Sequence, residues 1–269
     1  VSLRDRSGNR DIWIYDVRRG VPQRFTSSAD DELTATWTPN GARVIFNRRE
    51  GAAARLNLYE RDAAAIGNES PLLIDDRNKW PTSVSPDGRY LLYDAGTEGN
   101  SDIAVLALQG ERTTRTIVDS KASEGGSQFS PDGRWIAYHS NASGESEVYV
   151  TPFPGPGRHE RVSSNGGRWP RWRHDQKELF FLSEGASLSS LADNKLMAVD
   201  ITVKDSSIHI GEVRTLFDAP IPGFGRGAPY AVTPDGDRFL LNTMTEDPYD
   251  SSIWLIVNWP AILREPVQQ

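Results

Sequence analysis

The stretch Phe129-Ser130-Pro131-Asp132-Gly133 is one copy of a short repeated pattern that decides the fold. The pattern is an apolar residue followed by Ser or Thr, then Pro, then Asp or Asn, then Gly. Proline presets φ at the first corner of a turn and glycine supplies a positive φ, so the pattern predicts a tight turn. Three further copies and one degenerate copy are Trp37-Thr38-Pro39-Asn40-Gly41, Val84-Ser85-Pro86-Asp87-Gly88, Val232-Thr233-Pro234-Asp235-Gly236 and Trp172-Arg173-His174-Asp175-Gln176.

The spacing of these turns indicates a repeat architecture. The copies end at positions 41, 88, 133, 176 and 236, so they are 47, 45, 43 and 60 residues apart. The first three intervals are close to the roughly 40–45 residues of a four-stranded propeller blade. Each turn precedes a β-rich run such as Trp135-Ile136-Ala137-Tyr138, and a second run such as Val148-Tyr149-Val150 follows. A third run, such as Arg161-Val162-Ser163, closes most units, which predicts antiparallel blades.

The sequence therefore predicts an all-β chain forming one β-propeller domain over residues 1–269. The second run occurs six times and the turn five times, so five or six blades are expected, with incomplete blades at both ends. An N-terminal strand could complete the last blade, or two copies could share strands as a homodimer. The predicted limits are a partial blade at 1–27, blades at about 31–75, 78–119, 123–164 and 167–218, a partial blade at 226–259, and a tail at 260–269.

The repeat resembles that of the TolB-like, WD-repeat-like propellers, and the resemblance covers nearly the whole chain. The stretches Gly166–Trp172 and Ile256–Pro260 also resemble the C-terminal propeller region of bacterial envelope proteins and membrane-anchored serine/threonine kinases. No kinase motif is present, so kinase activity is not implied. The resemblance implies recognition of a protein or peptide, a periplasmic or extracytoplasmic location, and a larger bacterial parent protein.

Composition excludes several other classes of protein. The formal net charge of −7 is opposite to the basic surface that nucleic-acid binding needs. Cysteine is absent, which excludes disulfides and cysteine-ligated metals. No run approaches the roughly 18 apolar residues of a membrane span. We expect a soluble chain with no membrane segment and no signal peptide.

A binding site is expected at one mouth of the propeller channel. Residues just before each inner strand converge there, together with residues at the ends of the second strands. Cationic side chains at these positions could bind an anionic group, or they could pair with carboxylates of neighbouring blades. Tryptophans could stack on a ligand or pack between blades. The ligand-binding candidates are Glu32, Lys79, Trp80, Glu124, His139, Arg168, Trp169 and Arg226.

Two functions remain open at this stage. The leading hypothesis is a non-catalytic module that binds a ligand or protein, and no catalytic residue is assigned. The alternative is a metal-dependent hydrolase of lactone, ester or phosphotriester substrates at the channel mouth. Ca²⁺ or another divalent cation would then be the cofactor, because such ions take several oxygen ligands. The candidate metal ligands are Glu32, Asn78, Asp94, Glu124 and His139.

Overall fold

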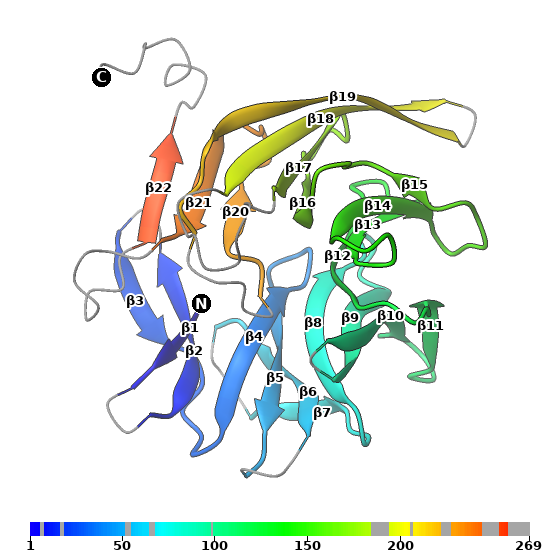
Figure 1. Ribbon diagram of the computed structural model, residues 1–269. Coiled ribbons are helices and arrows are strands. Elements are labelled where there is room, and N and C mark those ends of the chain that lie inside the picture. Colours follow the sequence, from blue (N-terminus) through cyan, green and yellow to red (C-terminus); the bar gives the residue numbers. More distant parts are fainter. Residues whose placement is uncertain are drawn as a thin grey trace. The chain divides into compact units, whose positions relative to one another are not determined.

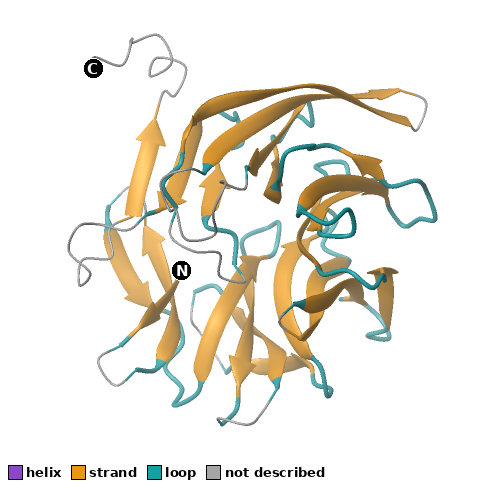
Figure 2. Cartoon of the chain, in the orientation of Figure 1, coloured by secondary structure: helices purple, strands orange, loops and turns teal. Residues whose placement is uncertain are grey.

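The structure is a computed structural model, in which strands β1 to β22 follow one another without an intervening helix in the described residues (Figures 1 and 2). It describes residues 1–5, 8–16, 19–51, 55–64, 68–97, 99–183, 194–204, 207–221 and 227–243, and the backbone of 253–257. The chain divides into a first unit, Val1–Ser123, and a second unit, Glu124–Gln269. Within the described ranges no helix is long and apolar enough to cross a membrane.

The first unit contains three antiparallel sheets. The first sheet has three described strands: β1 (Ser2–Arg4), β2 (Arg10–Asp16) and β3 (Val21–Arg24). The second has four: β4 (Asp31–Trp37), β5 (Arg43–Arg49), β6 (Leu56–Asp62) and β7 (Ser70–Leu73). The third also has four: β8 (Asn78–Val84), β9 (Tyr90–Thr97), β10 (Asn100–Ala107) and β11 (Thr114–Val118).

The second unit repeats this arrangement. Its first sheet comprises β12 (Glu124–Phe129), β13 (Trp135–Ser140), β14 (Glu147–Pro152) and β15 (Glu160–Arg161). Its second comprises β16 (Arg168–Trp172), β17 (Glu178–Leu182), β18 (Lys195–Lys204) and β19 (Ser207–Asp218). Its third has three described strands: β20 (Tyr230–Val232), β21 (Arg238–Asn242) and β22 (Ile253–Val257).

The prediction of an all-β chain with four-stranded antiparallel sheets is confirmed. In every sheet the strands pair in chain order, and each neighbouring pair is antiparallel. The single-domain assignment, the blade limits, the blade number and the closure of the ring stay predictions.

The repeated turn forms as its sequence predicts, because its own side chains satisfy its backbone. The Ser130 hydroxyl donates to Asp132 Oδ1 at 2.6 Å and accepts the Trp135 N–H at 2.9 Å. Asp132 Oδ1 also accepts the Arg134 N–H at 3.0 Å, and Gly133 has a φ of 71°. The copies at 85–90, 38–43 and 233–238 repeat the three contacts.

The degenerate copy at 172–176 is held differently. His174 stands where the other copies have proline, and its N–H donates to the carbonyl of Pro234 at 3.3 Å. Arg173 stands where the others have Ser or Thr, and its guanidinium binds Asp175 at 2.7 Å and also Glu178. Gln176 takes the glycine position with a φ of 63°. The turn is thus retained: the Lys177 N–H still donates to Asp175 Oδ1 at 3.1 Å, while ionic contacts of Arg173 and a hydrogen bond to the next turn replace the two contacts of the missing hydroxyl.

Apolar side chains pack neighbouring sheets against one another within each unit. In the first unit Ile45 and Leu58 meet Leu91 and Tyr93 in one buried cluster. In the second unit the cluster containing Trp135, Val150 and Val162 includes Phe181 and Ile201 from the next sheet. A further cluster joins β16–β19 to β20 and β21. This packing holds the first strand of each sheet in place. Four of these first strands, β4, β8, β12 and β16, have a bulge near the predicted site residues.

Candidate functional site

Glu32, a predicted ligand-binding and metal-binding residue, is fully buried at the start of the first unit's second sheet. Its carboxylate accepts hydrogen bonds from Thr26 Oγ1 at 2.9 Å and Ser28 Oγ at 2.6 Å. Arg48 Nε donates to it at 2.7 Å. Burial raises the pKa of the Glu32 carboxyl above its usual value, while hydrogen bonds from Ser28 and Arg48 oppose the shift. Glu32 therefore ties the loop before β4 to β5.

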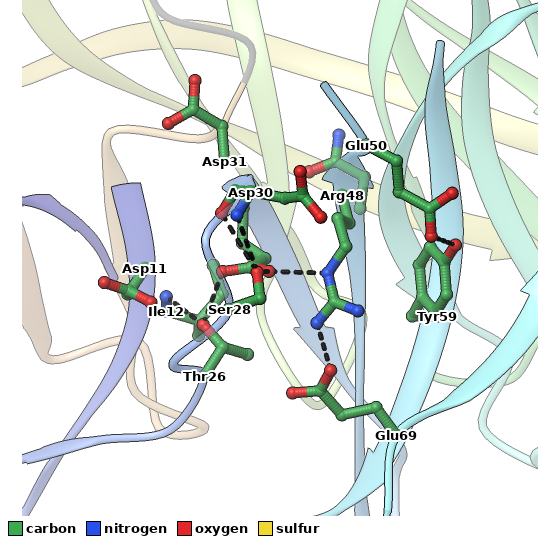
Figure 3. Close-up of polar contacts among 12 residues, drawn as sticks. Asp11, Ile12, Thr26, Ser28, Asp30, Asp31, Arg48, Glu50, Tyr59 and Glu69 are labelled. Carbon is green, nitrogen blue, oxygen red and sulfur yellow. Dashed lines mark hydrogen bonds and ion pairs between the residues drawn. The ribbon is translucent and has the colours of Figure 1, made fainter. Parts of the chain in front are cut away.

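Arg48 extends this contact into a network, which Figure 3 shows together with its neighbours Tyr59 and Glu69. Its second nitrogen binds the Glu69 carboxylate, and its guanidinium lies 4.8 Å from the centre of the Tyr59 ring. Tyr59 donates its hydroxyl hydrogen to Glu50. Burial, with this hydrogen bond, raises the pKa of Tyr59 to about 12. No pattern in the sequence pointed to Arg48 as part of a site.

Lys79, predicted to bind an anionic group, is also fully buried and already paired. Its ammonium donates to Asn57 Oδ1 at 3.0 Å and to the Arg77 carbonyl at 2.7 Å. It also forms an ion pair with Asp75 at 2.7 Å. Burial lowers the pKa of the Lys79 ammonium, against the opposing effect of Asp75. These partners occupy its donors within the first unit.

The other candidates of the first unit lie in the same strands. Asn78 accepts the Leu56 N–H at 2.9 Å through its side-chain oxygen. Trp80 and Asp94 are paired across β8 and β9, and both side chains are buried. Asn47 of β5 donates its amide to the Lys79 carbonyl at 2.8 Å. The structure therefore brings the predicted residues Asn78, Trp80 and Asp94 into one polar frame with Asn47, which is itself buried.

In the second unit the structure brings His139 and Trp169 into direct contact. Their ring centroids are 5.1 Å apart with an interplanar angle of 66°. The backbone N–H of Trp169 donates to His139 Nδ1 at 3.5 Å. Gly126 allows this approach, because a Cβ there would lie 2.7 Å from Trp169 Cε3 and 2.8 Å from His139 Cε1. The bulge in β12 that contains Gly126 thus makes room for the pair.

Trp169 has an unusual backbone and an unusual side chain. Its φ is 57°, a left-handed conformation that costs an L-residue roughly 1–2 kcal/mol. The Tyr230 hydroxyl donates to the Trp169 carbonyl at 2.7 Å and holds this conformation. The ring is 4% exposed, and its Nε1 has no hydrogen-bond partner among the described residues.

Glu124 and Arg168 flank this pair. Glu124 begins β12 directly beside the residue that pairs with His139, and it accepts a hydrogen bond from Ser140 Oγ at 3.0 Å. Arg168 begins β16 and is partly buried. Glu124 lies at the start of β12, His139 lies near the end of the antiparallel strand β13, and Arg168 and Trp169 lie at the start of β16. We call these four residues the His139–Trp169 cluster.

Arg226 lies outside the described residues. Of the candidate metal ligands, Glu32, Asn78 and Asp94 belong to the first unit and Glu124 and His139 to the second. In the described part of the chain no three histidine or acidic side chains are grouped as a metal site would need. The divalent-cation site stays a prediction.

Sequence reasoning missed a polar clamp that occurs in both units. Arg24 binds Asp11 at 2.6 Å and donates to the Thr26 carbonyl at 3.1 Å, while Thr26 Oγ1 accepts the Ile12 N–H. In the second unit Arg161 binds Glu147 and donates to the Ser163 carbonyl at 2.7 Å. A sequence pattern could have indicated this clamp. The third run reads Arg, an apolar residue, then Thr or Ser, and it recurs together with an acidic residue just before the second run.

The fold and its repeated polar contacts define a class of protein: an all-β repeat protein in which the first strands of the sheets begin at buried polar clusters. The profile of the TolB beta propeller domain matches residues 75–210. The chain belongs to that family, which confirms the resemblance seen in the repeat.

Similar solved structures support the same fold. TolB from Acinetobacter baumannii superposes with a TM-score of 0.75 at 20% identity, over 96% of this chain and 60% of that chain. An oligogalacturonate lyase in complex with manganese has a TM-score of 0.60 at 13% identity, over 95% and 70%. A Mycobacterium tuberculosis puromycin-hydrolyzing peptidase has a TM-score of 0.57 at 14% identity, over 96% and 45%. These identities establish the fold alone, and a comparison with curated proteins gives no match.

Proposed function

We propose that this chain is a non-catalytic module that binds a protein or peptide partner at the His139–Trp169 cluster. The observation that carries the proposal is the left-handed backbone of Trp169, with φ at 57° and the ring against His139. Strained non-glycine residues concentrate at ligand sites, where the surrounding structure holds them in place. Arginine is also among the residues most enriched at the energetic centres of protein interfaces, and Arg168 is the partly buried arginine of the cluster.

The chemistry of the cluster suits a partner with both an apolar and an acidic group. The partly buried Arg168 guanidinium would bind a carboxylate, and the partly exposed His139 ring would contact an apolar side chain. Glu32 and Lys79 support the proposal indirectly. Their contacts within the first unit give them a structural role, which leaves the ligand-binding role to the cluster.

The setting of the module is part of the same proposal. Membership of the TolB beta propeller domain family supports a periplasmic or extracytoplasmic location in a bacterium. The chain spans 60% of the length of the A. baumannii TolB structure, which is consistent with a module of a larger protein.

Peptide selection followed by titration tests the binding role. Random dodecapeptides displayed on phage are selected on the immobilised chain, and labelled peptides are then titrated by fluorescence anisotropy. Arg168→Glu should weaken binding of cluster-directed peptides by about tenfold or more, since it replaces attraction of a carboxylate by repulsion. Arg158→Glu is the matched control, because Arg158 is an exposed arginine of the same unit whose side chain is 86% accessible. If no selected peptide is sensitive to Arg168→Glu, the cluster is not the binding site.

An activity assay tests whether the chain lacks hydrolase activity. Ester, lactone and phosphotriester substrates are incubated with the chain, with and without EDTA. Turnover that EDTA abolishes and that falls in both Glu124→Gln and His139→Asn would replace the binding proposal with a metal-dependent hydrolase. Equal background rates in all variants support a binding role.

A further inference from the structure

The second unit has a groove at the opposite ends of the strands that carry the His139–Trp169 cluster. Its volume is about 690 Å³. It is lined by the turn between β12 and β13, the turn between β16 and β17, and residues 200–203 of β18. The family's repeated turn therefore forms two walls of the groove, and a strand forms the third.

That strand has an open edge inside the groove. β17 pairs only with Leu196 to Asp200 of β18, from Leu182 to Glu178. β18 continues to Lys204, and residues 201–204 pair only with β19. β18 and β19 are 10 and 12 residues long and form the long hairpin visible in Figure 1. Apart from the Ile201 N–H, which donates to the Lys177 carbonyl, the side of β18 that faces β17 is thus left without a strand partner over residues 201–204.

The backbone groups of this edge point toward the groove. The Ile201 N–H points to the β17 side, where it donates to the Lys177 carbonyl at 2.8 Å. Alternate residues of a strand direct their N–H and C=O groups to the same side. The N–H and C=O of Val203 therefore point past the end of β17, and no described strand pairs with them.

The edge is held in place by its own packing. Ile201 and Ile208 belong to the buried cluster that contains Val150 and Val162, and Val203 packs against it. The hairpin is therefore fixed on the β12–β15 sheet before any partner binds. A preformed edge lowers the ordering cost of strand addition.

Charge in the groove defines the chemistry of the occupant. Each acidic residue that lines it is paired: Asp132 with Arg134, Asp175 and Glu178 with Arg173, and Asp200 with Arg214. Lys177 also lines the groove and is exposed, and within the described ranges its ammonium makes no ion pair. An incoming carboxylate would complete the charge pairing of the groove.

We propose that this groove binds an extended peptide segment of a partner protein by strand addition to residues 201–204 of β18. Main-chain hydrogen bonds to Val203 supply affinity, and an acidic side chain of the peptide binds Lys177. The four-residue edge spans about 13 Å, which accommodates a segment of similar length. This site is separate from the His139–Trp169 cluster and does not depend on the function proposed there.

Two substitutions at one position test the main-chain contact. Val203→Pro deletes the N–H that points into the groove, and proline is tolerated where the N–H of an edge strand is unpaired. Val203→Ala also removes the branched valine side chain but keeps the N–H, so it is the matched control. Random dodecapeptides are selected on the native chain and counter-selected on Val203→Pro. The selected peptides should bind Val203→Pro about tenfold more weakly than Val203→Ala.

A charge exchange tests the second contact. Lys177→Glu should weaken the same peptides, and replacing the acidic residue of the peptide by lysine should restore their affinity for Lys177→Glu. Arg168→Glu should leave these affinities unchanged, which distinguishes failure of this groove from failure of the proposed cluster.

The proposal is overturned if no peptide discriminates Val203→Pro from Val203→Ala, or if the charge exchange gives no restoration. Sedimentation velocity provides the remaining outcome. Self-association of the native chain that Val203→Pro abolishes and Val203→Ala retains would assign the edge to a second copy of the chain, and would overturn the peptide partner.

Discussion

Gly126 leaves the space in which His139 and Trp169 meet, and its replacement by alanine should lower the stability of the fold. The φ of 63° disfavours an L side chain by roughly 1–2 kcal/mol. The new Cβ would also lie 2.7 Å from Trp169 Cε3, and overpacking of this kind costs about 1–3 kcal/mol. We expect Gly126→Ala to lower the free energy of unfolding by about 3 kcal/mol, measured by urea denaturation.

Gly110 offers the matched control, because its φ is 68° but a Cβ there would meet nothing within 4 Å. Gly110→Ala should show the backbone cost alone, about 1 kcal/mol. Equal losses in the two variants would mean that the approach of the two rings does not depend on Gly126.

The positions of several candidate residues along the strands could be predicted from the sequence, but their contacts could not. Glu32, Lys79 and Glu124 were predicted from their places before inner strands, and the structure does put them at strand starts. Their burial depends on partners distant in sequence, such as Arg48 for Glu32. A charged residue gives the same sequence signal whether it faces solvent or a buried partner. The left-handed backbone of Trp169 gave no signal at all.

The repeated turn is the element whose stability the sequence explains best, and its hydroxyl is open to a direct test. Ser130 is fully buried, and its loss would leave the Trp135 N–H without its acceptor and would remove one of the hydrogen bonds to Asp132. Leaving a buried donor unsatisfied costs about 1–3 kcal/mol. We expect Ser130→Ala to lower the free energy of unfolding by about 2 kcal/mol in urea denaturation.

Thr233 makes the same contacts in an exposed copy of the turn, where water can replace the hydroxyl. Thr233→Ala should therefore cost only about 0.5 kcal/mol. If both substitutions cost the same, burial does not determine the contribution of the turn.

Elements with local causes were predicted well, and elements with tertiary causes were not. The turns and the strands after them follow from Pro, Gly and alternating apolar residues within a few positions. The length of β18 and β19 was not predicted, because Ile201 and Ile208 are stabilised by Val150 and Val162 of another sheet. The His174 turn likewise depends on Pro234, 60 residues later.

For the whole chain, the family could be predicted because the repeat recurs along nearly all of it. One copy of the turn would have been weak evidence, and five copies in register specify a propeller. Blade number and ring closure are different, because they depend on contacts between the first and last strands. No local pattern encodes those contacts.

The repeated turns also determine how the whole chain should respond to acid. In Asp87, Asp132 and Asp175, burial alone would raise the carboxyl pKa, but hydrogen bonds within the turn and a neighbouring arginine lower it below its usual value. In Asp235 the Thr233 hydroxyl lowers it. The unfolded chain then binds these protons first, so the turns contribute stability above the usual pKa of 3.8 and lose it as the pH falls through the folded values. Glu32 acts in the opposite sense, because its raised pKa means that the folded chain takes up its proton first.

Asp132→Asn isolates the contribution of one turn. Asn40 shows that an amide oxygen can accept the same two hydrogen bonds, from the Thr38 hydroxyl and the Ala42 N–H. The variant therefore keeps the geometry of the turn and removes the charge. The urea midpoint is measured for both chains between about pH 7 and pH 2.5. The native chain should be the more stable at neutral pH, and its advantage should shrink below about pH 3.8, because Asp132 is then progressively protonated. An advantage that stays constant over this range would show that the Asp132 charge does not stabilise the turn.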